Sequence, residues 1–109
     1  MTREALITLM QTTGIYFDPD HPDHIEDKKI SSLSPPFLEF VIREEPFAAD
    51  DVVYYVFNRI TIRFYSDLDV DEAEDLVRAA IDNYFYRVSK VYDEGLGLWE
   101  TTFTFTDKS

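Results

Sequence analysis

The order of secondary-structure patterns between residues 36 and 106 is the strongest constraint on how this chain folds. Two strand-like segments come first, a helix-like segment follows, and two further strand-like segments end the run. The helix-like segment, residues 70–86, has apolar side chains at the i, i+3, i+4, i+7 spacing of one stripe. These side chains are Ala73, Leu76, Val77, Ala80, Ile81, Tyr84 and Phe85. We therefore predict an α+β fold in which an amphipathic helix packs on one face of an antiparallel or mixed β-sheet of about four strands.

The four strands are predicted over residues 37–44, 52–65, 87–93 and 98–106, where apolar and polar residues alternate and β-branched and aromatic residues are frequent. Pro46 is expected to end the first strand, with a turn over residues 46–51. The segment from Glu94 to Gly97 predicts a hairpin turn between the last two strands. The second strand is apolar on both faces near its start. Another element or a neighbouring subunit is therefore expected to cover it there, and part of it is expected to project as a hairpin arm.

The N-terminal third is predicted to be a short helix followed by a long polar loop. Residues 2–13 indicate the helix, with Thr2 as its N-cap and Gly14 in the left-handed conformation after its end. Residues 15–35 are rich in proline, acidic and serine residues, which is typical of a loop, with a short strand over residues 15–17. We expect one domain, residues 1–109, whose ββαββ core spans residues 37–106.

The composition restricts the possible functions. The chain has 22 acidic and 10 basic residues, a net charge of −12, and no cysteine. Disulfides and thiolate chemistry are thus excluded, and direct nucleic-acid binding is disfavoured because it needs clustered Lys and Arg. The charge is explained either by solubility or by work beside a polyanion to which the protein does not adhere. No apolar run is long enough for a membrane span and no signal peptide is recognisable, so we expect synthesis in the cytoplasm.

Five potential metal ligands lie within seven residues of the polar loop. They are Asp18, Asp20, His21, Asp23 and His24. Carboxylate and imidazole groups suit Zn²⁺ or a similar ion. The alternative is a solvated turn in which the aspartates accept hydrogen bonds from local backbone N–H groups. The spacing matches no established metal motif, so we predict no metal site.

A second acidic motif precedes the main helix. Asp67, Asp69 and Asp71 imitate the start of a calcium loop, but Glu72 stands where such a loop needs glycine and Arg78 where it needs glutamate. Helix capping explains the motif better. We expect Asp69 to be the N-cap and Glu72 to complete a capping box.

One face of the long second strand combines arginine and aromatic residues, which favours a protein interface. The predicted subunit-interface residues are Val53, Tyr55, Phe57, Arg59, Arg63 and Tyr65. A nucleic-acid platform would use similar residues, but two arginines in so acidic a chain do not make one. We expect both arginines to pair with acids, on this chain or on a neighbour.

No motif indicates catalysis, because the chain has no nucleophile motif and no phosphate-binding glycine loop. We therefore expect a protein that is not an enzyme, with no catalytic residues and no cofactor. A metal-dependent enzyme that uses His21 and His24 is the remaining catalytic interpretation.

The layout as a whole resembles the tail completion or tail terminator proteins of the head–tail joining region of long-tailed bacteriophages and prophages. The segments that carry the resemblance are Thr13–Ile15, Pro35–Phe40, Phe47–Asp51, Asn58–Ser66, Asp71–Glu74 and Trp99–Phe105. In that family the strand before the helix commonly ends in an aromatic–polar pair, as Phe64-Tyr65-Ser66 does here.

The resemblance implies a structural virion protein that forms a ring, expected to be a hexamer, which caps the tail tube and docks onto the head connector. Its partners would be further copies of itself, the tail tube protein and the head connector protein. It would reside in the host cytoplasm during assembly and then in the virion. A negative lumen would repel the passing DNA. The alternative is a small acidic adaptor, or a DNA-mimic inhibitor, that binds another protein.

Overall fold

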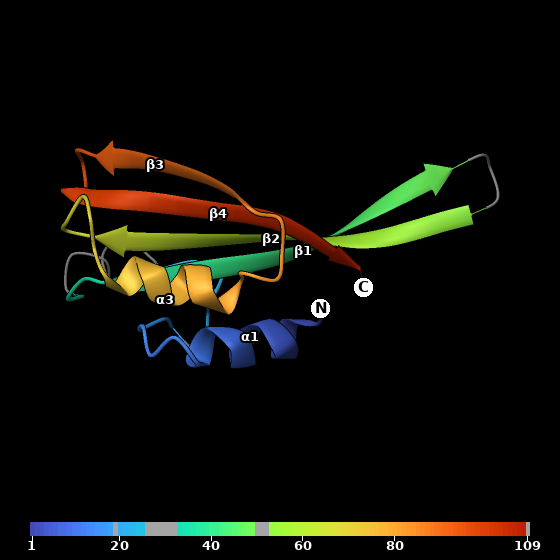
Figure 1. Cartoon of the computed structure of the whole chain (residues 1–109), viewed down its shortest axis with the longest axis horizontal. Coiled ribbons are helices and arrows are strands. Elements are labelled where there is room, and N and C mark those ends of the chain that lie inside the picture. Colours follow the sequence, from blue (N-terminus) through green and yellow to red (C-terminus); the bar gives the residue numbers. More distant parts are fainter. Residues whose placement is uncertain (19, 26–32, 50–52, 109) are drawn as a thin grey trace.

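The fold is α+β, as predicted, in a computed structural model that describes residues 1–18, 20–25, 33–49 and 53–108. The elements in chain order are α1 (Arg3–Gln11), β1 (Phe37–Ala49), β2 (Val53–Ser66), α3 (Ala73–Ala80), β3 (Arg87–Asp93) and β4 (Leu98–Lys108). The strands form one antiparallel sheet in the order β1-β2-β4-β3. Both helices lie on the same face of this sheet (Figure 1).

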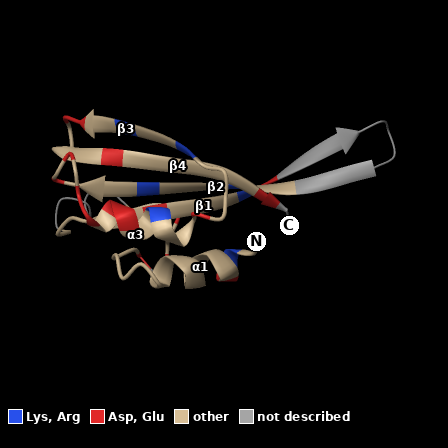
Figure 2. Ribbon diagram, in the orientation of Figure 1, with Lys and Arg blue, Asp and Glu red and all other residues tan. Residues whose placement is uncertain are grey.

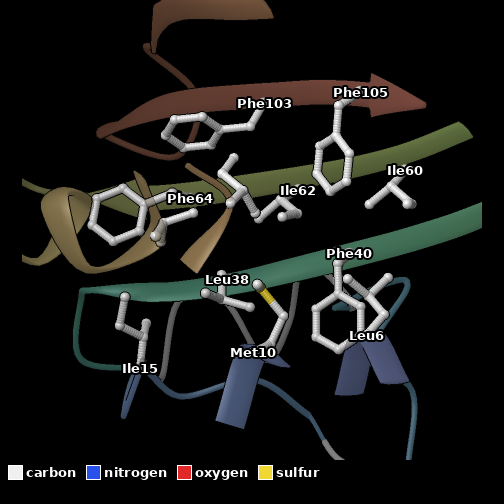
Figure 3. Packing of buried hydrophobic residues seen from close by; sticks show 12 residues of the cluster. Leu6, Met10, Ile15, Leu38, Phe40, Ile60, Ile62, Phe64, Phe103 and Phe105 are labelled. Carbon is white, nitrogen blue, oxygen red and sulfur yellow. The ribbon is translucent and has the colours of Figure 1, made fainter. Parts of the chain in front are cut away.

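The main hydrophobic core lies between the helices and this face of the sheet. Alternate residues of β1, β2 and β4 point toward the helices, and Figure 3 shows Leu38 and Phe40 of β1 beside Leu6 and Met10 of α1. The buried members of the cluster are Leu6, Met10, Ile15, Leu38, Phe40, Ile60, Ile62, Phe64, Val77, Ile81, Phe103 and Phe105. Burying a large apolar side chain contributes about 1.5–3 kcal/mol. The helices are too short to be stable alone, so this packing holds them in place.

Helix α1 begins as its sequence indicates and ends at Gln11, two residues before the predicted end at residue 13. The Thr2 side chain accepts a hydrogen bond of 3.1 Å from the Ala5 backbone N–H, which confirms Thr2 as the N-cap. Gly14 has a φ of +70°, which confirms the left-handed position after the helix.

The short strand expected at residues 15–17 is reduced to a single bridge between Tyr16 and Phe37. Within the described residues, no helix is long and apolar enough to cross a membrane.

Helix α3 is shorter than the predicted 70–86 and begins differently. Its start is held by Asp71, whose Oδ1 accepts from the Ala73 N–H at 2.9 Å and whose Oδ2 accepts from the Ser66 hydroxyl at 2.7 Å. The prediction that Asp69 is the N-cap was therefore wrong. Asp71 takes the capping role because its carboxylate can satisfy the helix and the end of β2 together.

Helix α3 ends at Ala80, because Ile81 leaves the helical conformation with φ −115° and ψ 17°. Two members of the predicted stripe are not buried. Leu76 is about half exposed and Phe85 is fully exposed. The predicted burial was confirmed for Val77 and Ile81, which are in the core.

Strand β1 continues through Pro46 to Ala49, so the expectation that Pro46 ends it was wrong. Pro46 pairs with Val56 in the β1–β2 ladder. A proline is tolerated there because β1 is an edge strand and the proline nitrogen faces away from β2. Strand β4 pairs with β2 only from Phe57 onward. Within the described residues, 46–49 and 53–56 therefore form a two-stranded hairpin arm, which projects beyond the sheet as predicted (Figure 1).

The polar connection after α1 follows the outer edge of β1 and then covers part of the other sheet face. The Leu38 N–H donates to the Tyr16 carbonyl at 2.9 Å, and the Phe40 N–H donates to the Pro22 carbonyl at 2.7 Å. A second buried cluster on this face comprises Ile25, Phe37, Tyr65 and Leu98, with Leu33 and Leu96 packed against it. The described part of this connection is therefore packed against the sheet.

Candidate functional site

The sheet face opposite the helices, called the open face, carries the predicted interface residues. Of these, Arg59, Arg63 and Tyr65 alternate along β2 with the core residues Ile60, Ile62 and Phe64, so they point the other way. Residues that pair across neighbouring strands form four rows on this face. The first row is Arg43, Arg59 and Thr106, and the second is Val41, Thr61, Thr104 and Arg87. The third is Glu39, Arg63, Thr102 and Ser89, and the fourth is Phe37, Tyr65, Glu100 and Val91.

The structure places the predicted interface residues in different environments. Arg59 and Arg63 are exposed on the open face. Tyr65 is only 5% exposed, because Ile25 and its neighbours cover it. Val53 and Tyr55 are in the hairpin arm, where the side chains lie outside the described part of the chain; Phe57 is half-buried where the arm meets the sheet. Their use in a subunit interface stays a prediction.

Beside Tyr65 the open face contains a buried carboxylate with three donors, which we call the Glu39 cluster. Glu39 is 4% exposed. Its Oε2 accepts from the Ile25 N–H at 3.0 Å, and its Oε1 accepts from the Tyr65 hydroxyl at 2.8 Å and from Arg63 Nη1 at 3.2 Å. Arg63 also lies 3.7 Å from Glu100, measured from Nε to Oε1. The cluster thus attaches the segment around Ile25 to three strands.

The pKa shifts in the Glu39 cluster follow from burial and from this pairing. Burial, and then the hydrogen bond and charge of Glu39, raise the pKa of Tyr65 far above its ordinary value. Burial lowers the pKa of Arg63, but the hydrogen bond and charge of Glu39 outweigh it, so the net shift is upward. Burial raises the pKa of Glu100 more than Arg63 lowers it. The cluster is therefore charge-paired, and both carboxylate oxygens of Glu39 accept hydrogen bonds.

The sequence predicted only part of this cluster. Pairing of Arg63 with acids was expected and is present. The burial of Glu39 was not expected, because the period-two pattern of β1 places it on the polar face. The signal that would have revealed it is Ile25, an apolar residue in a polar loop that needs a surface to pack against.

The other end of the open face has a depression of about 340 Å³, called the arginine depression, lined by Arg59, Phe85, Arg87, Thr104, Phe105 and Thr106. Tyr84 stacks on Phe105 with ring centroids 4.7 Å apart, and Tyr86 packs edge-on against Phe103 at 5.8 Å. Both tyrosines face inward, so Phe85 between them is left fully exposed. The sequence missed this feature because it continued the helix through Phe85.

The possible metal ligands of the polar loop do not converge. Asp18 is buried, and its Oδ1 accepts from the backbone N–H groups of Asp20 at 3.0 Å and His21 at 3.4 Å. Asp20, His21, Asp23 and His24 are exposed. Across the described residues, no group of three or more His, Asp or Glu side chains is placed to hold a metal ion. Asp18 makes the turn-stabilising contacts of the alternative interpretation.

The segment that imitates a calcium loop is a well-anchored turn, called the acidic loop and comprising residues 67–72. The Leu68 N–H donates to the Ser66 hydroxyl at 3.0 Å, and Lys90 Nζ donates to the Asp69 carbonyl at 2.5 Å. Lys90 also lies 3.2 Å from Glu74 Oε1. Asp67, Leu68, Asp69 and Val70 are all exposed. Figure 2 places this loop at the end of the sheet that is remote from the hairpin arm.

The groups on these surfaces suit non-covalent binding. The arginine depression offers guanidinium, aromatic and hydroxyl groups, and the acidic loop offers carboxylates beside apolar side chains. Comparison with protein-family models, with curated proteins and with solved structures returned no match.

Proposed function

We propose that this protein is a structural component of a phage or prophage virion that assembles into a ring at the head–tail junction. In this proposal the ring completes the tail tube and joins it to the head connector. The observation that carries the proposal is the hairpin arm, in which residues 53–56 of β2 pair, within the described chain, with β1 alone. A projecting arm is a means of contacting a neighbour.

The arm supports self-association because it is not stable by itself. A two-stranded hairpin in water is marginally stable at best and needs a third strand or a packed face. Its sequence is almost uncharged: Pro46-Phe47-Ala48-Ala49 on one strand and Val53-Tyr54-Tyr55-Val56 on the other. Strands of this composition are stabilised when a neighbouring copy covers them. In a ring, each copy would supply an arm to the next, which is a heterologous contact that closes on itself.

The net charge of −12 is also consistent with the proposed site. DNA leaves and enters the head through the junction, and a ring wall with excess carboxylates repels a duplex. The low content of clustered basic residues then prevents adhesion during passage. The proposal therefore expects the acidic surface to line the pore.

Light scattering coupled to size exclusion, followed by negative-stain microscopy, tests the proposal. The wild-type protein should form rings with a central hole. Replacing Val53→Lys and Tyr55→Lys adds two charges to the arm and should leave monomers. The matched control, Thr8→Lys with Gln11→Lys, adds the same charge to exposed positions of α1 and should still form rings. A wild-type protein that stays monomeric up to millimolar concentration contradicts the proposal.

The rival function, an acidic adaptor or DNA mimic, is less well supported by the open face. A DNA mimic presents rows of carboxylates at the spacing of phosphates. Here the exposed rows of the open face carry Arg43, Arg59, Arg63 and Arg87. A monomer that binds a DNA-binding protein and blocks its DNA would favour the rival.

A further inference from the structure

We propose that the arginine depression of one copy binds the acidic loop of the next copy. This inference depends on the proposed function, because it assigns the surfaces through which the ring would close. It adds a second contact, formed by side chains on the body of the protein, to the contact made by the hairpin arm.

The arginine depression is suited to an anionic segment that also carries apolar side chains. Arg59 and Arg87 are exposed at its rim, and Arg43 lies directly opposite Arg59 on β1. Phe85 adds a fully exposed ring, and arginine and aromatic residues are the types that dominate interface energetics.

The acidic loop has the complementary chemistry. Asp67 and Asp69 provide two exposed carboxylates, while Leu68 and Val70 are 55% and 83% exposed. Acidic and apolar side chains thus alternate over four residues, which matches a surface that offers guanidinium groups beside an aromatic ring. The hydrogen bonds from Leu68 to Ser66 and from Lys90 to Asp69 fix the loop before binding. A preorganised loop loses less conformational entropy on association.

The two surfaces are placed for a head-to-tail contact. The acidic loop follows Ser66 at one end of β2, and Arg59 lies seven residues earlier on the same strand. At about 3.3 Å per residue the separation along the strand is roughly 23 Å. The surfaces are therefore distinct and too far apart to meet within one copy. Each copy can donate its loop to one neighbour and accept the loop of another, as ring closure requires.

A second copy fits the depression better than a nucleic acid does. A chain with net charge −12 repels a duplex more strongly than a second copy, because duplex DNA carries one negative charge per about 1.7 Å of its axis. A short acidic loop gains the arginine contacts and also buries Leu68 and Val70 against Phe85. A titration of the purified protein with labelled duplex DNA should accordingly show no binding at physiological salt.

Charge reversal tests the contact, with association measured by sedimentation velocity over a range of concentrations. Variant A carries Arg59→Glu and Arg87→Glu, and variant B carries Asp67→Lys and Asp69→Lys. Each alone should weaken association at least tenfold. An equimolar mixture should assemble again, because B retains the native depression for the native loop of A, and the reversed loop of B fits the reversed depression of A.

Two additional variants separate the contact from general charge and folding effects. Arg59→Gln with Arg87→Gln changes the net charge from −12 to −14, as does the control Thr8→Glu with Gln11→Glu on α1. The first should weaken association and the control should not. Phe85→Ala, at a fully exposed position, should weaken association without loss of the folded circular-dichroism spectrum.

The outcomes distinguish this inference from the proposed function. If variants A and B form rings as the wild type does, or if their mixture fails to assemble, the surfaces are wrongly assigned while the ring remains. If the wild-type protein forms no rings at all, the proposed function fails and this inference fails with it.

Discussion

Tyr65 on β2 donates a hydrogen bond of 2.8 Å to the buried Glu39 on β1, one row away across the open face. Such a bond to a charged acceptor contributes about 1.5–3 kcal/mol, more than one between neutral groups. It holds together two strands and, through the Ile25 N–H, the segment that covers them. The Glu39 cluster is therefore expected to be a stability determinant of this face.

Tyr65→Phe should lower the free energy of unfolding by about 2 kcal/mol, because it removes one of three donors from a buried carboxylate. Urea denaturation followed by fluorescence measures the change. Tyr16→Phe is the matched control, since Tyr16 is half exposed and should shift stability by less than about 0.5 kcal/mol. Equal effects for the two variants would show that the Tyr65 hydroxyl adds nothing specific.

Glu74 should make stability depend on pH in the acidic range. Burial raises the pKa of Glu74, but the Thr101 hydrogen bond and the contacts with Lys90 and Arg78 outweigh it, so the pKa lies below the ordinary 4.5. A depressed carboxyl pKa stabilises the folded state above the ordinary value, and this contribution is lost as the pH falls through the folded value. Glu74→Gln should thus cost about 1 kcal/mol at pH 7.

The measurement for Glu74 is denaturant unfolding of both proteins between pH 7 and pH 3. The difference between wild type and Glu74→Gln should be constant above pH 4.5 and should shrink below it. A difference that does not change over this range would mean that the ion pairs with Lys90 and Arg78 do not contribute.

Phe103→Ala should destabilise the fold by about 3–5 kcal/mol, because Phe103 is fully buried and contacts Tyr86 and the Arg78 guanidinium. Phe85→Ala removes the same side chain from a fully exposed position and should change stability by less than about 0.5 kcal/mol. Calorimetry of the two variants gives the comparison. A large effect at Phe85 would place its ring in the core, as the helical pattern of the sequence first indicated.

Gly97→Ala should destabilise the β3–β4 hairpin by about 1 kcal/mol. Gly97 has a φ of +68°, and its N–H donates to the Asp93 carbonyl at 2.8 Å to close the turn. A Cβ at this position is strained in the left-handed region, whereas asparagine tolerates that region better. Gly97→Asn should therefore retain more stability than Gly97→Ala in thermal unfolding. The reverse order would exclude backbone strain as the cause.

The sequence predicted the elements whose own residues set the pattern. Strand β3 coincides with the predicted 87–93, because the turn at Glu94–Gly97 sets the hairpin, and β4 extends only slightly beyond 106. The end of α3 was missed because Tyr84 and Phe85 continue the helical spacing after the backbone has left the helix at Ile81. The spacing of apolar residues along the chain does not reveal that Tyr84 stacks on Phe105 of β4 while the Phe85 side chain is exposed.

The candidate surfaces were predicted less completely, because they depend on contacts between distant segments. Arg59 and Arg63 were correctly placed on one face of β2 by their spacing alone. The burial of Tyr65 and Glu39 depends on Ile25, which is 14 residues from Glu39 in the chain and 40 from Tyr65. The arginine depression likewise needs Arg87 to lie beside β4, and that follows only from the strand order.

The outer edge of β1 has a consequence for aggregation. Along this edge the backbone N–H groups of Leu38 and Phe40 already donate to the carbonyls of Tyr16 and Pro22. Every second residue of β1 directs its backbone nitrogen to this edge, and Pro46, which is one of these residues, has no N–H. An unprotected edge recruits foreign strands and seeds fibrils, whereas this one is interrupted along its length. The chain is thereby protected from strand-by-strand polymerisation along this edge.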